Sequence, residues 1–152
     1  MENSVKPSGK RRQARELAAQ FLYQNDISGG PLDEALALFW QTQLDVSDAT
    51  RKFAEELIRG CIKQGAPIDE KIKKYTEHWE LSRIAAVDRN ILRLAIYEML
   101  FRDDIPPIVS INEAVDIAKK FSTRESGAFV NGILDRLRGD LPRPARTAAP
   151  AK

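Results

Sequence analysis

The sequence contains a single cysteine, Cys61, and a single histidine, His78, among its 152 residues. One cysteine excludes an internal disulfide framework and permits a reducing compartment. One residue of each kind also excludes a zinc site built from four cysteine and histidine ligands. Cys61 falls on the apolar side of an expected helix, so we interpret it as a small buried hydrophobe. We interpret His78, between Glu77 and Trp79, as a surface or packing residue.

The chain also lacks the glycine-rich sequences that bind nucleotides. No Walker loop is present, and no GxGxxG follows an expected strand. We therefore predict that the protein is not an enzyme and that it needs no cofactor or metal. No stretch is long and uncharged enough to span a bilayer, and no apolar signal-peptide core follows the basic N-terminus. These absences predict a cytoplasmic protein without membrane contact.

What the sequence does contain is a strongly apolar segment, IAAVDRNILRLAIYEMLF, at residues 84–101. At about 100° per residue, its apolar side chains cover most of the girth of a helix, which is typical of a helix buried on several sides. Two carboxylates, Asp88 and Glu98, fall on that apolar side and need partners. We favour a structural ion pair or cap, with Arg59 or Arg83 as the partner; an acid/base pair is the alternative.

Apolar spacing and Gly/Pro breaks predict an all-α domain of about seven helices around this central one. The first helix begins near Lys10 and stops before Gly29, and the next three span about residues 32–43, 48–64 and 69–79. Ser47 or Asp48 is the expected N-cap of the third helix. The last two helices are expected to open at capping boxes, SINE at residues 110–113 and STRE at residues 122–125.

The net charge of +2 is unevenly distributed. Residues 1–15 carry +4, residues 140–152 carry +2, and the body between them carries −4. Basic ends on a mildly acidic body indicate a polyanion held at a terminus. We predict a flexible basic arm at residues 1–9, a helical domain at residues 10–138, and a disordered basic Pro/Ala-rich tail at residues 139–152.

The strongest binding signal is the segment KRRQAR at residues 10–15, which places Arg11 and Arg15 one helical turn apart with Arg12 beside them. Guanidinium groups pair with phosphate oxygens and stack on unpaired bases, and arginine-rich segments are a known way to hold RNA. Tyr23 lies about three turns after Arg12, where it can stack on a base or simply pack half-buried. A solvated helix start that only improves solubility remains the alternative for the arginines.

A second candidate surface is FSTRESGAF at residues 121–129, which combines Arg124, several hydroxyl groups and a helix N-terminus. Backbone N–H groups at a helix start favour an anion. From the residues alone we prefer a simple capped turn.

Three segments resemble the NusB family of transcription antitermination factors: RRQARELAAQFLY at 11–23, VDRNILRLAIYEML at 87–100, and SINEAVDIAKKFSTRESGAFVNGILD at 110–135. The resemblance covers nearly all of residues 10–137. It implies two small helical bundles that share a core. It also implies binding to boxA RNA of nascent ribosomal RNA transcripts with NusE, a small-subunit ribosomal protein, in a transcribing RNA polymerase complex with other Nus factors.

By position, the resemblance implies RNA contacts from Arg11, Arg12 and Arg15 and supports a role for Tyr23. Gln13 departs from the more continuous basic run usual in the family, and we expect Lys6 and Lys10 to supply the missing charge. The resemblance also makes the 122–129 loop an expected RNA or NusE surface. There we expect RNA contacts from Arg124, Ser126 and Phe129, and a partner contact from Glu125. Whether the free protein is a homodimer is left open.

Two alternatives come from other classes of protein. A similar helical module begins some ribosomal RNA cytosine methyltransferases, but this chain has no room for the methyltransferase domain. The other alternative is a protein-binding helical adaptor with an incidental basic arm. Salt dependence separates the adaptor from an RNA binder, because neutralising four or five phosphates of a single strand gives a slope of log affinity against log salt of about −3.

Overall fold

The computed structural model describes residues 7–76, 80–142 and 144–145. Within these ranges the chain forms seven α-helices, one short 3-10 helix and no strand, which confirms the all-α prediction. The elements are α1 (Pro7–Ser28), α2 (Leu32–Gln41), α3 (Asp48–Lys63), α4 (Gly65–Tyr75), η1 (Leu81–Arg83), α5 (Ala86–Phe101), α6 (Pro107–Phe121) and α7 (Arg124–Asp140). None of the described helices is long and apolar enough to cross a membrane.

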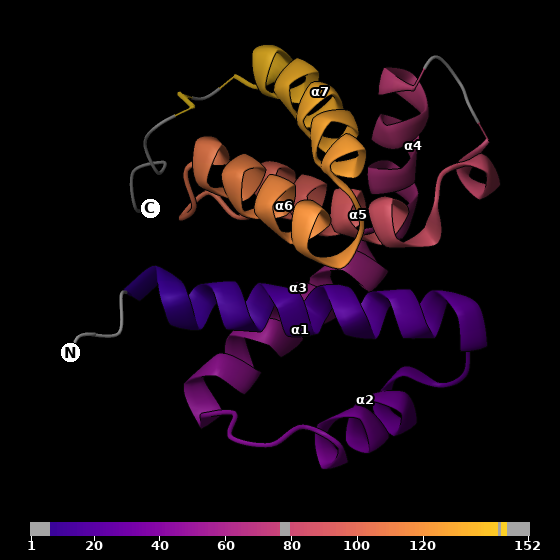
Figure 1. Cartoon of the computed structure of the whole chain (residues 1–152), viewed down its shortest axis with the longest axis vertical. Coiled ribbons are helices and arrows are strands. Elements are labelled where there is room, and N and C mark those ends of the chain that lie inside the picture. Colours follow the sequence, from indigo (N-terminus) through magenta and orange to yellow (C-terminus); the bar gives the residue numbers. More distant parts are fainter. Residues whose placement is uncertain (1–6, 77–79, 143, 146–152) are drawn as a thin grey trace.

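Helix α5 is the centre of the molecule, as the apolar girth of its sequence predicts. It contacts α1 and α3 on one side and α4, α6 and α7 on the other. In Figure 1, α1 runs across the molecule, with α2 on one side and α6 and α7 on the other. The buried apolar side chains of both groups form one continuous cluster, in which Leu92 and Ile96 of α5 are completely covered. The two bundles therefore share a core, as expected.

Several boundaries differ from the expected ones. Helix α1 already begins at Pro7, and α4 begins at Gly65 rather than near residue 69. Pro67 lies in the first turn of α4. The backbone N–H groups of a first turn have no acceptor within the helix, so a proline there costs no hydrogen bond and does not break the helix. Cys61 is buried as predicted, and burial raises the pKa of its thiol. His78, most of the predicted arm and most of the predicted tail lie outside the described residues.

Of the expected helix caps, only that at Ser47 is confirmed, where the hydroxyl accepts a hydrogen bond from the Thr50 N–H at 3.1 Å. The SINE box is wrong, because α6 begins three residues earlier, at Pro107. The STRE box is displaced by one residue, since Thr123 rather than Ser122 caps α7 and accepts from the Ser126 N–H at 3.0 Å.

The two carboxylates of α5 have different partners from those expected. Glu98 is buried and accepts hydrogen bonds from Arg15 Nε at 2.9 Å, Arg15 Nη2 at 2.8 Å and Ser110 Oγ at 2.8 Å. Glu98 is thus in a structural ion pair, but with Arg15 and not with Arg59 or Arg83. Asp88 forms no described ion pair; its Oδ2 accepts from Ser126 Oγ at 3.1 Å, and burial raises its pKa.

Candidate functional site

The basic segment forms the first turns of α1, and its outer cations face solvent. Lys10 and Arg11 are both exposed. The Arg11 guanidinium lies 3.8 Å from the centroid of the Phe53 ring, and the Arg102 guanidinium lies 5.4 Å from the same centroid. A guanidinium over an aromatic face is held by the ring quadrupole without giving up its outer donors. Phe53 of α3 thus positions Arg11 at the surface.

Arg12 lies over α6 and engages two carboxylates. Its Nε and Nη2 donate to Glu113 Oε1 and Oε2, each at 2.6 Å, and Nη2 also donates to Asp116 Oδ2 at 2.9 Å. The hydrogen bonds to Glu113 raise the pKa of the Arg12 guanidinium above its ordinary value, and the charges of Glu113 and Asp116 add to this. The Arg12 side chain still retains a third of its exposure.

Arg15 lies in a different environment from the two arginines before it. It is only 4% exposed, and its fork is taken by Glu98 of α5. A buried guanidinium that is saturated by a carboxylate does not present its donors to a phosphate. The structure therefore does not place Arg15 for the RNA contact that the sequence suggested, because α5 covers this part of the α1 face.

Tyr23 lies two turns further along α1 than Arg15 and is 37% exposed. It lines a groove of about 230 Å³ with Val87 and Ile91 of α5 and Phe121 at the end of α6. The aromatic side chain of Phe121 belongs to the second sequence-predicted surface. The structure thus brings Tyr23 together with the start of that surface.

At the start of α7, Arg124 and Glu125 are exposed, whereas Ser126 is buried. The Ser126 hydroxyl lies 2.9 Å from Ser122 Oγ and donates to Asp88 at 3.1 Å. It therefore points inward and ties α7 to α5, away from the position expected for an RNA contact. The exposed groups of this turn are those that precede the serine, Arg124 and Glu125.

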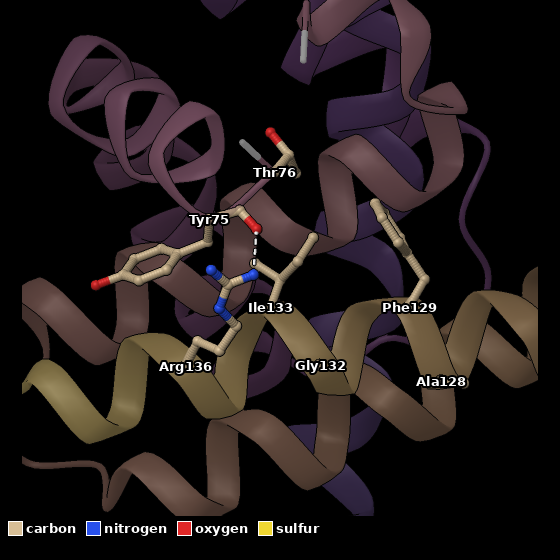
Figure 2. Close-up of a pocket in the computed structure, with 7 residues that line it drawn as sticks. All are labelled: Tyr75, Thr76, Ala128, Phe129, Gly132, Ile133 and Arg136. Carbon is tan, nitrogen blue, oxygen red and sulfur yellow. Dashed lines mark hydrogen bonds between the residues drawn. The ribbon is translucent and has the colours of Figure 1, made fainter. Parts of the chain in front are cut away.

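Phe129 lines a pocket of about 400 Å³ between α4 and α7, which Figure 2 shows. In that view Phe129 and Arg136 project from α7 on either side of Ile133. Arg136 Nη1 donates to the carbonyl oxygen of Tyr75 at 3.1 Å, so the cation is fixed at the end of α4. The pocket combines an aromatic wall, a planar cation and backbone at Gly132, a composition that suits an unpaired base.

Sequence reasoning missed Tyr75 and Arg136. A signal for Arg136 was available, because Phe129, Gly132, Ile133 and Arg136 recur at spacings of three or four residues and so share one face of α7. No comparable signal existed for Tyr75, since it comes from a separate helix whose packing against α7 is decided by the tertiary fold.

The fold and these surfaces define an all-helical binding protein with a cationic helix start and an aromatic pocket. Residues 12–138 match the NusB family, and the chain belongs to it. The chain is 50% identical over 131 residues to the transcription antitermination protein NusB of Desulforapulum autotrophicum, covering 86% of this chain and 92% of that protein. It is 46% identical over 134 residues to the NusB of Geobacter sulfurreducens, covering 88% and 97%.

Solved structures agree with this assignment. NusB of T. maritima superposes with a TM-score of 0.77 at 39% identity, covering 89% of this chain and 92% of that one. A chain from the crystal structure of the antitermination factors NusB and NusE in complex with dsRNA superposes with a TM-score of 0.80 at 26% identity, covering 87% and 98%. Membership of a family of transcription antitermination proteins confirms the prediction that the chain is not an enzyme.

Proposed function

We propose that this protein is a cytoplasmic RNA-binding transcription antitermination factor. It binds boxA-type single-stranded RNA of nascent ribosomal RNA transcripts together with NusE, and the pair joins a transcribing RNA polymerase complex with other Nus factors. Family membership supports the antitermination role. This chain superposes over most of its length on a chain from the structure of NusB and NusE with dsRNA. That structure supports NusE and RNA as the two partners.

The observation that carries the RNA-binding part is the charge of the first turns of α1. A helix start is stabilised by acidic side chains and opposed by basic ones, because of the helix dipole. Helix α1 has no acidic residue in its first turn, and Lys10, Arg11 and Arg12 follow directly. Lys10 and Arg11 are exposed cations at this helix start, where the helix dipole does not favour them and an anionic ligand would stabilise them.

In this proposal the two surfaces bind different parts of a single strand. Lys10, Arg11 and Arg12 contact phosphates, while Phe129 and Arg136 offer a stacking site for a base. We assign three further exposed residues, Tyr23, Arg124 and Glu125, to RNA and NusE contacts. Arg15 and Ser126 act indirectly, because each holds the helix on which the contacting residues lie.

The test is an RNA titration by fluorescence anisotropy at several salt concentrations, with a boxA-like strand and a scrambled strand, with and without NusE. The double variant Arg11→Ala/Arg12→Ala removes two exposed cations and leaves the buried Arg15 in place. Arg51→Ala/Arg59→Ala on α3 is the matched control, since both arginines are exposed and carry the same charge.

We expect NusE to tighten binding to the boxA-like strand. The α1 variant should weaken binding and reduce the steepness of the salt slope by about 1 to 1.5, the value for two phosphate contacts on a single strand. The α3 control should leave the slope unchanged. If both strands bind equally weakly and the α1 variant changes nothing, the basic segment only improves solubility, and the protein-binding adaptor is the better description.

A further inference from the structure

Arg12 is held by one carboxylate more than its geometry requires. Glu113 alone engages both Nε and Nη2 in a two-bond fork at 2.6 Å. Nη2, which already donates to Glu113, also donates to Asp116 at 2.9 Å, and this is the third hydrogen bond of the Arg12 guanidinium. One guanidinium thus neutralises two carboxylates incompletely, and a negative charge is left over beside the basic segment.

The two carboxylates differ in exposure. The Glu113 side chain retains 12% of its exposure and the Asp116 side chain 51%. Glu113 therefore forms the inner wall of the contact between α1 and α6, where Arg15 Nη1 also approaches it at 3.7 Å. Asp116 lies at the outer rim, on the side from which a ligand in solution would reach Arg12.

Among the described residues, the ion pairs of this contact do not balance. They join two guanidiniums, of Arg12 and Arg15, to three carboxylates, of Glu98, Glu113 and Asp116. Carboxylate and phosphate oxygens are equivalent acceptors for a guanidinium, and both carry the negative charge that it binds. An exposed carboxylate on Arg12 therefore occupies the same kind of position that an RNA phosphate would take, and it also repels that phosphate.

We propose that Asp116 competes with an RNA phosphate for Arg12 and so limits the affinity of the basic segment for RNA. This inference rests on the proposed function. When RNA binds, the phosphate displaces Asp116 from Nη2, while Glu113 keeps its fork and holds Arg12 on α6. Asp116 is thus an affinity-setting residue that opposes binding, and Glu113 is a positioning residue.

The test compares Asp116→Asn with Asp33→Asn. Both changes remove one exposed carboxylate that pairs with an arginine, but Asp33 lies on α2 and binds Arg59 of α3. Affinity for the boxA-like strand is measured by anisotropy at low and high salt, for each variant alone and in an Arg12→Ala background. Thermal unfolding followed by circular dichroism checks that every variant is folded.

We expect Asp116→Asn to tighten RNA binding about threefold to tenfold at low salt and less at high salt, as for a charge within a few ångströms of a phosphate. Asp33→Asn should change the affinity by less than about twofold, because the described partner of Asp33 is Arg59 of α3 and not an arginine of the basic segment. In the Arg12→Ala background the gain from Asp116→Asn should largely disappear, because there is no longer a guanidinium to release.

Three outcomes overturn the inference in different ways. If RNA binding depends on Arg12 but Asp116→Asn behaves like the control, Asp116 does not compete and only this inference fails. If the gain persists undiminished without Arg12, Asp116 acts through its general charge and the competition is wrong. If the unmodified protein binds RNA without dependence on salt or on Arg12, the RNA-binding role of the basic segment fails as well.

Discussion

The two ends of α1 are attached to the rest of the molecule with opposite polarity. Near its start, α1 supplies guanidiniums, and Arg12 and Arg15 bind carboxylates of α5 and α6. Near its end, α1 supplies a carboxylate. Asp26 Oδ2 accepts from Arg89 Nη2 at 2.7 Å, Asn90 Nδ2 at 3.0 Å and Arg93 Nη1 at 3.2 Å.

Both arrangements are the reverse of what the helix dipole favours, which is acid at the start and base at the end. Helix α1 has no acidic residue in its first turn and no basic residue in its last. Tertiary ion pairs therefore stabilise both ends where local electrostatics would not. The difference is that the charges at the end of α1 balance, since Asp26 and Asp69 face Arg89 and Arg93. At the start they do not, and this is the end to which we assign RNA binding.

The largest expected effect concerns the buried pair at the start of α1. Glu98→Gln removes the carboxylate that is hydrogen-bonded to the buried Arg15 guanidinium and leaves it with Glu113, 3.7 Å away, as a countercharge. This change should lower the free energy of unfolding by about 3 kcal/mol, the lower end of the range for breaking a buried ion pair. Urea denaturation at neutral pH measures the loss. The double variant Arg15→Met/Glu98→Leu, which removes both charges, should recover most of it. A loss below about 1 kcal/mol would show that the pair is not what attaches α1 to α5.

A smaller effect is expected at the opposite end. Burial alone would raise the pKa of Asp26, but hydrogen bonds from Arg89 and Asn90 and the charge of Arg93 outweigh it and lower the pKa. A lowered pKa in the folded state means that Asp26 stabilises the fold above its ordinary pKa of about 3.9 and loses this contribution as the pH falls below it.

Asp26→Asn should therefore cost about 1.5–3 kcal/mol at pH 7, the range for hydrogen bonds to a charged group. The difference from the unmodified protein should shrink as the pH is lowered through about 4. Urea denaturation across this pH range measures it. A difference that stays constant down to pH 3 would mean that the Asp26 charge is not involved.

The smallest effect is expected at an exposed ion pair of α1, in which Glu16, the residue after Arg15, binds Lys120 of α6 at 3.1 Å. The Lys120 side chain is 59% exposed, and exposed pairs contribute little because water screens them. Lys120→Ala should change the free energy of unfolding by less than about 0.5 kcal/mol in the same urea assay. A loss comparable with that at Asp26 would remove the distinction between the more buried and the more exposed ion pairs of α1.

The capping boxes show where sequence reasoning failed. Ser110 and Glu113 have the spacing of a box, but Pro107 starts α6 earlier, and both side chains are then used in tertiary contacts with Glu98 and Arg12. A local hydrogen bond between neighbours can be read from spacing. Whether a side chain from another helix replaces that local hydrogen bond depends on which helices the tertiary fold packs together.

The sequence by itself determined the class of fold and the central place of α5, because an apolar girth has to be buried on several sides whatever surrounds it. It also located the cations at the start of α1. Only the tertiary structure decided what each of them does. Arg11 and Arg15 are one turn apart on nearly the same face, yet Arg11 is exposed and Arg15 is buried. The reason is that α5 brings Glu98 against Arg15, whereas Arg11 lies over the Phe53 ring of α3 at the surface. A buried guanidinium must be paired within the protein.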